Sequence, residues 1–205
     1  MKTIAIITGD IINSRGHNTA VWMDSLKSFL LQFGDTPSTW EIYRGDEIQI
    51  RMPMKQALYA ALQLKALIKS IKGLDIRMAI GIGSETYIGA GISESNGTAY
   101  QRSGRTLEAL KENKVTLMFA SADEKYNKTI NLMLKLASDF MDDWSPVSAE
   151  IVFLSLISPN VSQQNLAEQL NIKQSAVSQR MKRARLNLVE DLLMYYEETI
   201  KAIKE

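Results

Sequence analysis

Apolar and polar residues follow one another along the first 120 residues in a pattern that predicts alternating strands and helices. Long apolar runs predict strands over Thr3–Ile12, Leu74–Gly83 and Val115–Ser121, and apolar residues at helical spacing predict helices over Thr19–Phe33, Met54–Ile71 and Thr98–Lys111. Two short alternating runs flank Gly45 in "WEIYRGDEIQIRM" and predict a β-hairpin. This order predicts an α+β fold of the ferredoxin-like kind, an antiparallel or mixed sheet with helices on one face.

The rest of the chain has helical periodicity only. A helix is predicted over Asp123–Trp144, and its position suggests a link between two domains. We therefore expect an α+β domain over residues 1–120, a linker helix over 121–145 and an all-α domain over 146–205. The strand "LDIRMAIGIG" ends in Gly81 and Gly83, which allow a bend or the close approach of another element.

A helix-turn-helix pattern is the most specific signal in the all-α domain. Ser162 is placed to cap a short helix, Asn171 suits the left-handed backbone of a tight turn, and Val177 and Met181 face inward from the next helix. With a preceding helix over Ser148–Ile157, the unit resembles the helix-turn-helix domains of sigma-factor-like and MarR-like regulators. That resemblance implies an all-α helix-turn-helix domain that binds double-stranded DNA.

The second helix of this pattern carries the side chains that DNA recognition requires. Its outward positions are expected to contact base edges through Gln174, Ser175, Ser178 and Gln179, and phosphates through Arg180, Lys182, Arg183 and Arg185. Residues 173–185 contain five cations and no carboxylate. The alternative is that these helices simply pack together and the cations form a solvated face.

The overall composition makes this local clustering informative. Lys and Arg number 24 and Asp and Glu number 23, so the formal net charge is only +1 and affinity for a polyanion must come from a local patch. The absence of cysteine and the single His17 exclude thiolate and histidine-rich zinc sites. The short apolar run at the N-terminus does not fit a signal peptide, and no run approaches the roughly 20 apolar residues of a membrane span, so a cytoplasmic protein without a membrane partner is expected.

A heptad-like apolar stripe follows the helix-turn-helix pattern. It consists of Leu186, Val189, Leu193, Tyr196, Ile200 and Ile203. Such a stripe requires a partner helix. The partner is either the same helix of a second subunit, which would make a homodimer with two DNA-binding heads, or the helix around Phe140 of the same chain. The dimer is the preferred interpretation.

Two acids occupy the ends of predicted neighbouring strands. Asp10 lies near the end of the first strand and Asp46 at the hairpin tip, so we expect both at one rim, where they could hold Mg²⁺ against a nucleotide triphosphate. The alternative is turn chemistry, because aspartate bonds its own backbone in turns. Asp10 interrupts an apolar run, however, and a buried carboxylate requires a partner. Arg15 and Arg44 are the candidate partners.

Several short motifs in the N-terminal part resemble known families. "RGDEI", "IRMAIGIG" and "GTAYQRSGRTL" resemble the palm domains of class III nucleotide cyclases and diguanylate cyclases, and "TGDIINSR", "GDEIQ" and "IGIG" in this order resemble the SatD family. The cyclase resemblance implies a ferredoxin-like palm. It also implies that Asp10 and Asp46 are metal ligands and that Arg105 is a catalytic arginine.

A ligand site is also expected, and the chain departs from the cyclase pattern at several positions. The residues assigned to ligand binding are Arg15, Arg44, Glu47 and Gln101. Gln101 replaces an asparagine of the cyclases, Ile42 occupies the place of their base-selecting lysine, and Thr98 stands where they often have an acid. Nothing therefore supplies base selection in the cyclase manner.

Three functions are compatible with these features. The preferred hypothesis is a DNA-binding transcriptional regulator whose palm-like domain senses a nucleotide or a metal. The second is a Mg²⁺-dependent nucleotidyl cyclase or related nucleotidyltransferase with a regulatory helical tail. The third is an interaction module whose acids have no catalytic role.

Overall fold

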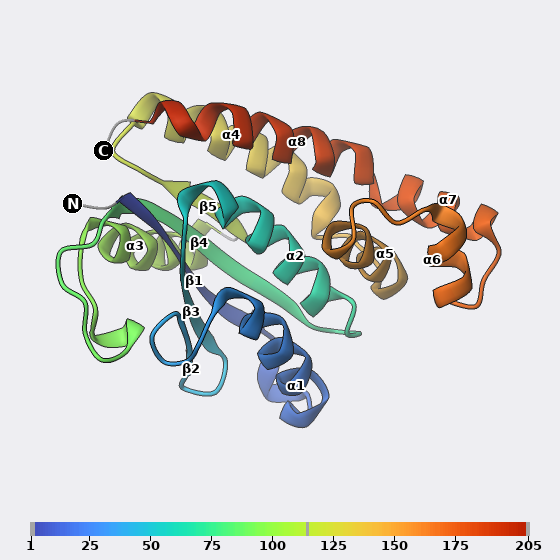
Figure 1. Cartoon of the computed structure of the whole chain (residues 1–205), viewed down its shortest axis with the longest axis horizontal. Helices are drawn as coiled ribbons and strands as arrows, with labels where there is room; N and C mark the ends of the chain where they lie inside the picture. Colours follow the sequence, from blue (N-terminus) through green and yellow to red (C-terminus); the bar gives the residue numbers. More distant parts are fainter. Residues whose placement is uncertain (1–2, 114, 204–205) are drawn as a thin grey trace.

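The computed structural model describes residues 3–113 and 115–203, and within them the chain forms one mixed five-stranded sheet and eight α-helices (Figure 1). The strands are β1 (Thr3–Ile12), β2 (Trp40–Tyr43), β3 (Glu47–Met52), β4 (Asp75–Ser84) and β5 (Leu117–Ala120). Their order is β2-β3-β1-β4-β5. The β1 strand is antiparallel to β3 and β4, and β5 is parallel to β4. The α+β class and the mixed sheet are confirmed.

The helices lie close to their predicted positions. They are α1 (Thr19–Leu30), α2 (Ala57–Lys69), α3 (Thr98–Asn113), α4 (Glu124–Met141), α5 (Pro146–Ile157), α6 (Gln163–Gln169), α7 (Gln174–Ala184) and α8 (Leu186–Thr199). Most boundaries differ from the sequence-based ones by a few residues, because short 3₁₀ turns such as Met54–Gln56 extend the helical pattern beyond the α-helix. Across the described residues, no helix combines the length and the apolarity needed to cross a bilayer.

Helices cover both faces of the sheet, so the expectation of helices on one face is wrong. Alternate residues of β1 point to opposite sides. Ala5 and Ile7 belong to the main core with α1 and α2, whereas Ile4 and Ile6 form a separate cluster with Tyr100 of α3. The reason is that β1 carries apolar side chains on both faces, and each face must be buried by packed helices.

The C-terminal helix α8 returns along the body of the molecule, beside α4 (Figure 1). Its apolar stripe is buried, and Tyr196 is only 1% exposed. The Tyr196 hydroxyl donates to the Met54 carbonyl at 2.7 Å, and its ring packs edge-on against Phe119. The stripe thus has its partners within the chain, α4 among them, which was one of the two predicted alternatives. A homodimer stays a prediction, without support from this stripe.

A buried charge network joins α2, β4 and the end of α4. The Lys65 ammonium, whose side chain is fully buried, lies 3.0 Å from a carboxylate oxygen of Asp75 and 2.7 Å from one of Asp142. The Lys69 ammonium lies 3.0 Å from the other oxygen of Asp75 and donates to the Asp142 carbonyl. Both ammonium groups therefore depend on Asp75 for compensation of their charge.

The side chain of Trp144 bonds to the junction between α7 and α8. Arg185 links the two helices in the left-handed conformation, with φ 53°. The buried indole of Trp144 donates to the carbonyl of Ala184, the last residue of α7, at 2.9 Å. The carboxyl end of α7 is thus fixed to the segment between α4 and α5.

Candidate functional site

Asp10 sits near the end of β1, where its neighbours across the sheet are Glu47 of β3 and Arg77 of β4. Its Oδ2 atom lies 3.2 Å from Nη1 of Arg77 and 3.8 Å from Nζ of Lys111 at the end of α3. The Oδ1 atom is buried and has no hydrogen-bond partner among the described residues. One carboxylate oxygen is thus neutralised by two cations, and the other is free to accept.

The partners of Asp10 are not the arginines that the sequence suggested. Arg15 and Arg44 lie in turns, and among the described residues neither pairs with this carboxylate. Arg77 takes that place because residues in register on neighbouring strands face the same side of the sheet. The available signal was a lone arginine inside the apolar β4 run. Lys111 is reached only through the packing of α3 and had no sequence signal.

Asp46 lies in the three-residue loop between β2 and β3. Arg44 and Gly45 adopt positive φ angles of 54° and 87°, which lets the chain reverse in so short a loop. The backbone carbonyl of Asp46 accepts from the Ile11 amide at 3.1 Å, and its Oδ2 accepts from the Ser14 hydroxyl at 2.6 Å. These bonds attach the hairpin tip to the turn that follows β1.

Both acids line one open cleft of about 630 Å³ between the hairpin tip, the turn after β1 and the turn at Gly73. The structure thus brings Asp10 and Asp46 to the same rim. Within the described residues, no cluster of three or more His, Asp or Glu side chains is arranged for a metal. Two carboxylates suit Mg²⁺ only if phosphate or water oxygens complete its shell, which is the usual arrangement for this ion. Metal binding by these residues stays a prediction.

Positive charge borders the acids. Arg15 lines both the Asp10/Asp46 cleft and a smaller adjoining one of about 200 Å³, and it has no ion-pair partner in the described part of the chain. Arg44 lies on the smaller cleft, 81% exposed and 4.0 Å from Glu47. The buried indole N–H of Trp22, which also lines the smaller cleft, has no acceptor among the described residues. This edge of the molecule could accept an anion.

Glu47, Gln101 and Arg105 do not line the Asp10/Asp46 cleft. On α3, Ser103 and Leu107 are buried, and the Thr8 hydroxyl donates to that of Ser103 at 2.9 Å. Arg105 lies two residues after Ser103 and two residues before Leu107. Two residues correspond to about 200° of rotation around the helix, so Arg105 lies on the opposite side of α3 from these buried residues and is exposed. The structure therefore does not place it beside the acids as the cyclase pattern implied. Glu47 lies next to Asp10 across the sheet. The pKa of Tyr43 is raised, first by burial and then by the charge of Glu47.

The second candidate surface is the outer side of α7. Ser162 caps α6 by accepting from the Asn165 amide at 3.1 Å, and Asn171 adopts a left-handed φ of 51° in the turn before α7. Val177 is fully buried. The exposed residues of α7 and its carboxyl end include Gln174, Ser175, Ser178, Gln179, Lys182, Arg183 and Arg185.

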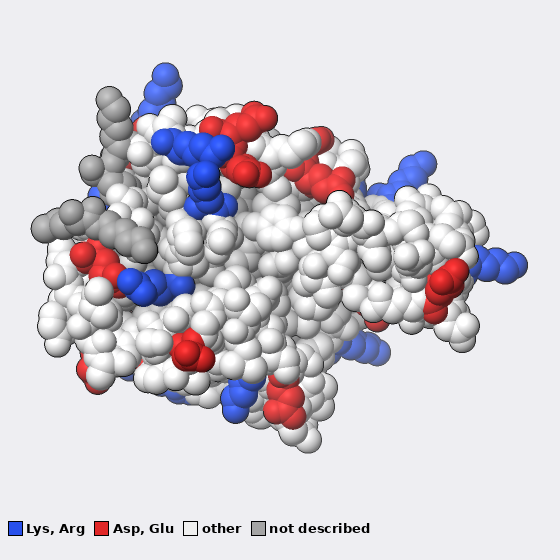
Figure 2. Space-filling view, viewed as in Figure 1, with Lys and Arg blue, Asp and Glu red and all other residues white. Residues whose placement is uncertain are grey.

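Three of the eight side chains assigned to DNA have partners within the chain. Arg180 pairs with Glu150 at 3.3 Å and is mostly buried, Gln174 donates to Gln163 at 2.6 Å, and the Arg185 guanidinium lies 5.4 Å from the centre of the Phe140 ring. The others make no such contact with described residues. Cationic side chains project from the outer edge of the lobe formed by α5 to α7, and acidic atoms are also visible on the same face (Figure 2).

Comparison with known proteins agrees with the motifs of the N-terminal part. No curated protein matches the chain. The model of the SatD family matches residues 3–192, which span most of the 205 residues and include both candidate surfaces. The chain belongs to the SatD family.

Proposed function

We propose that this protein is a DNA-binding transcriptional regulator in which α6 and α7 form a helix-turn-helix and α7 enters the major groove. The observation that supports the proposal is that the side chains of Ser175, Ser178 and Gln179 are available for hydrogen bonds. All three are exposed, and none has a hydrogen-bond partner among the described residues. Side chains of this kind on one helix face can bond to base edges, and the major groove is wide enough to admit a helix.

The charge distribution supports the same function. Lys173 precedes α7, and Lys182 and Arg183 lie in its last turn; all three are exposed and have no ion-pair partner in the described part of the chain. They flank the uncharged side chains of the middle turns. Cations at the two ends of a recognition helix can contact the phosphates on either side of the groove, which fixes the position of the helix.

We further propose that the N-terminal part senses a nucleotide or a metal at the Asp10/Asp46 cleft. The Oδ1 atom of Asp10 and the side chain of Arg15 have no partner among the described residues, and they offer groups to a cation and to a phosphate respectively. Such a ligand changes DNA affinity only if it binds two conformations of the protein with different affinities. DNA binding and ligand binding are therefore separable and are tested separately.

We expect the purified protein to bind DNA from upstream of its own gene at low salt, with a strong dependence on salt. If one α7 head neutralises about four phosphates, the logarithm of the affinity falls with the logarithm of the salt concentration at a slope of about −4, or about −7 for a dimer. Arg183→Ala should reduce the steepness of this slope by about 1 for each head. Fluorescence anisotropy with a labelled duplex measures both quantities.

Lys128→Ala is the matched control, because Lys128 is an exposed cation on α4, away from α7. It should leave the slope unchanged. Absence of binding at low salt, or a slope that Arg183→Ala and Lys128→Ala change equally, would contradict the DNA-binding proposal. The cations of α7 would then belong to another partner.

The second candidate function is a Mg²⁺-dependent nucleotidyl cyclase or nucleotidyltransferase. The observation in its favour is that Asp10 and Asp46 line one cleft. Against it stand the two cations that neutralise Asp10 and the position of Arg105 on the outer side of α3.

We expect no cyclic or transferred product when labelled ATP or GTP is incubated with the protein and Mg²⁺ or Mn²⁺. Chromatography of the labelled nucleotides measures the result. Asp46→Asn is the diagnostic variant, because it keeps the shape of the side chain and removes a metal ligand. Product that forms with the wild type and disappears with Asp46→Asn would establish the enzyme instead of the sensor.

A further inference from the structure

A cleft runs along α8 and shares no lining residue with the Asp10/Asp46 cleft. It consists of two adjoining cavities, one of about 420 Å³ between α5, α7 and α8 and one of about 430 Å³ that extends to α2. Ser155, Pro159, Asn187 and Glu190 line both cavities. We refer to the pair as the α8 cleft. Each cavity has the volume of an ordinary small-molecule site.

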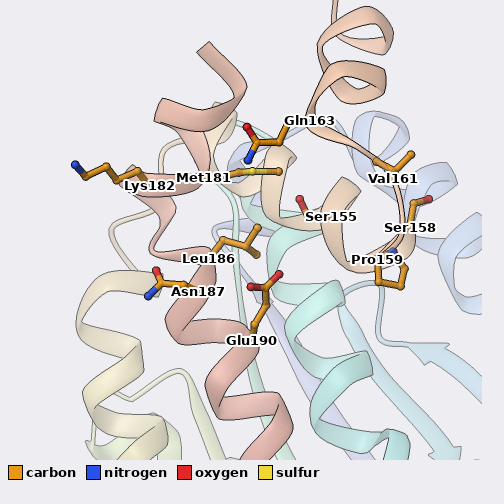
Figure 3. A pocket seen from close by; sticks show the side chains of 10 residues that line it. All are labelled: Ser155, Ser158, Pro159, Val161, Gln163, Met181, Lys182, Leu186, Asn187 and Glu190. Carbon is orange, nitrogen blue, oxygen red and sulfur yellow. The ribbon is translucent and has the colours of Figure 1, made fainter. Parts of the chain in front are cut away.

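The second cavity of the α8 cleft is largely apolar, whereas the first has both apolar and polar walls. In the first cavity, Met181 and Leu186 project from the side of α7 and α8, and Pro159 and Val161 lie across from them (Figure 3). The second cavity is lined by Leu193, Met194 and the rings of two tyrosines. Met194 is 56% exposed, a large fraction for so apolar a side chain. An apolar ligand could therefore remove exposed hydrocarbon from water.

Three of the five charged residues that line the α8 cleft are acids. Glu190 projects into the space between α8 and α5 (Figure 3). Asp191 and Glu197 line the second cavity. None of these three carboxylates forms a hydrogen bond or an ion pair with a described residue.

Two lysines also line the α8 cleft, but neither forms an ion pair with its three carboxylates among the described residues. The side chain of Lys182 extends away from the cavity, along the outer side of α7 (Figure 3). Lys55 lines only the second cavity, which three acids also line. The pKa of the Tyr59 phenol, which lines this cavity, is raised by burial and then by the charge of Glu190. The charge of Glu190 therefore acts on a neighbouring group that lines the second cavity.

We propose that the α8 cleft binds a small organic cation, an amine whose ammonium group pairs with Glu190 and whose alkyl or aryl part lies on Leu186 and Met194. Glu190 lies where the two cavities meet, so an ammonium group there leaves room for hydrocarbon on either side. A charge-assisted bond to an unpaired carboxylate supplies selectivity for a cation, and the apolar walls supply affinity for hydrocarbon. Neither the DNA-binding proposal nor the Asp10/Asp46 cleft is needed for this site.

The test compares three probes of equal chain length on the full-length protein: hexylamine, 1-hexanol and hexanoate. Ligand-observed and protein-observed NMR titrations at neutral pH measure the affinities. We expect saturable binding of hexylamine, weaker binding of hexanol and no binding of hexanoate. In Glu190→Gln, the affinity for hexylamine should fall by roughly tenfold or more, to the level of hexanol, because the charge-assisted bond is lost.

Glu198→Gln is the matched control, since Glu198 is exposed on α8 and lines neither cavity. It should bind hexylamine as the wild type does. A second variant, Asn187→Trp, places an indole on a residue that lines both cavities and should reduce binding of hexylamine and hexanol alike.

Three results would overturn the proposal. They are the absence of saturable hexylamine binding, equal affinity of the wild type and Glu190→Gln for hexylamine, and equal losses in Glu190→Gln and Glu198→Gln. The titration contains no DNA. A failure of DNA binding therefore leaves this result intact, and the reverse also holds.

Discussion

We expect Asp75→Asn to lower the free energy of unfolding by about 3–5 kcal/mol, the cost of breaking a buried ion pair from one side. Asp75 accepts from the ammonium groups of Lys65 and Lys69, whose side chains are only 0% and 9% exposed. Without the charge of Asp75, Lys65 keeps the carboxylate of Asp142, whereas Lys69 keeps only the Asp142 backbone carbonyl. A buried ammonium group without a counter-charge is strongly unfavourable.

Urea denaturation followed by circular dichroism measures the loss in the free energy of unfolding. A double variant tests whether the unpaired buried charge causes this loss. Lys65→Met combined with Asp75→Asn removes one buried cation together with the anion, so this pair should be less destabilised than Asp75→Asn alone. Asp24→Asn, at an exposed position of α1, should change stability by less than about 0.5 kcal/mol. If the double variant were the least stable of the three, charge burial would not be the reason.

The second large effect is expected at the contact between β4 and α3. A Cβ atom on Gly81 would lie 2.3 Å from the Ala99 carbonyl oxygen and 2.5 Å from the Ser103 amide nitrogen. Both are backbone atoms of α3, so Gly81→Ala can be accommodated only if the whole helix moves away from the sheet. We expect a loss of about 3 kcal/mol in the free energy of unfolding, at the upper end of the range for overpacking.

Gly104→Ala is the control on the same helix. A Cβ atom there meets nothing within 4 Å, so the better helix propensity of alanine should stabilise the protein by about 0.5–1 kcal/mol. Thermal unfolding of the two variants in parallel should therefore shift the midpoint in opposite directions. Equal stability of Gly81→Ala and the wild type would show that α3 does not lie on β4 as described.

Local pattern was sufficient to predict most of the elements and one of the contacts. The alternation around Gly45 predicted β2 and β3, and the glycines at the end of β4 predicted a close approach, which Gly81 and α3 confirm. The distribution of helices over the two faces was predicted wrongly. Strand β1 is apolar at nearly every position, and such a run gives no sign of which helix covers which side.

The candidate sites were predictable only where a residue lies at a turn or at the end of an element. Asp10 and Asp46 follow this rule, and both reach the same cleft. The partners of Asp10 depend on the strand register and on how α3 packs against the sheet. The sequence pattern predicts neither of these, so Arg77 and Lys111 were missed. The α8 cleft is lined by residues from four helices and the turns beside them, and no single segment indicates it.

The bond from the Trp144 indole to the Ala184 carbonyl bears on how this molecule could respond to a signal. It fixes the carboxyl end of α7, while the other end of the helix lies about 15 Å away. A rotation of α6 and α7 about this end would move Gln174 further than Arg183, and it would have to break the pair between Arg180 and Glu150 of α5. If α7 binds DNA as proposed, such a rotation would change the base contacts of Gln174 while Arg183 keeps its contact with the sugar–phosphate backbone.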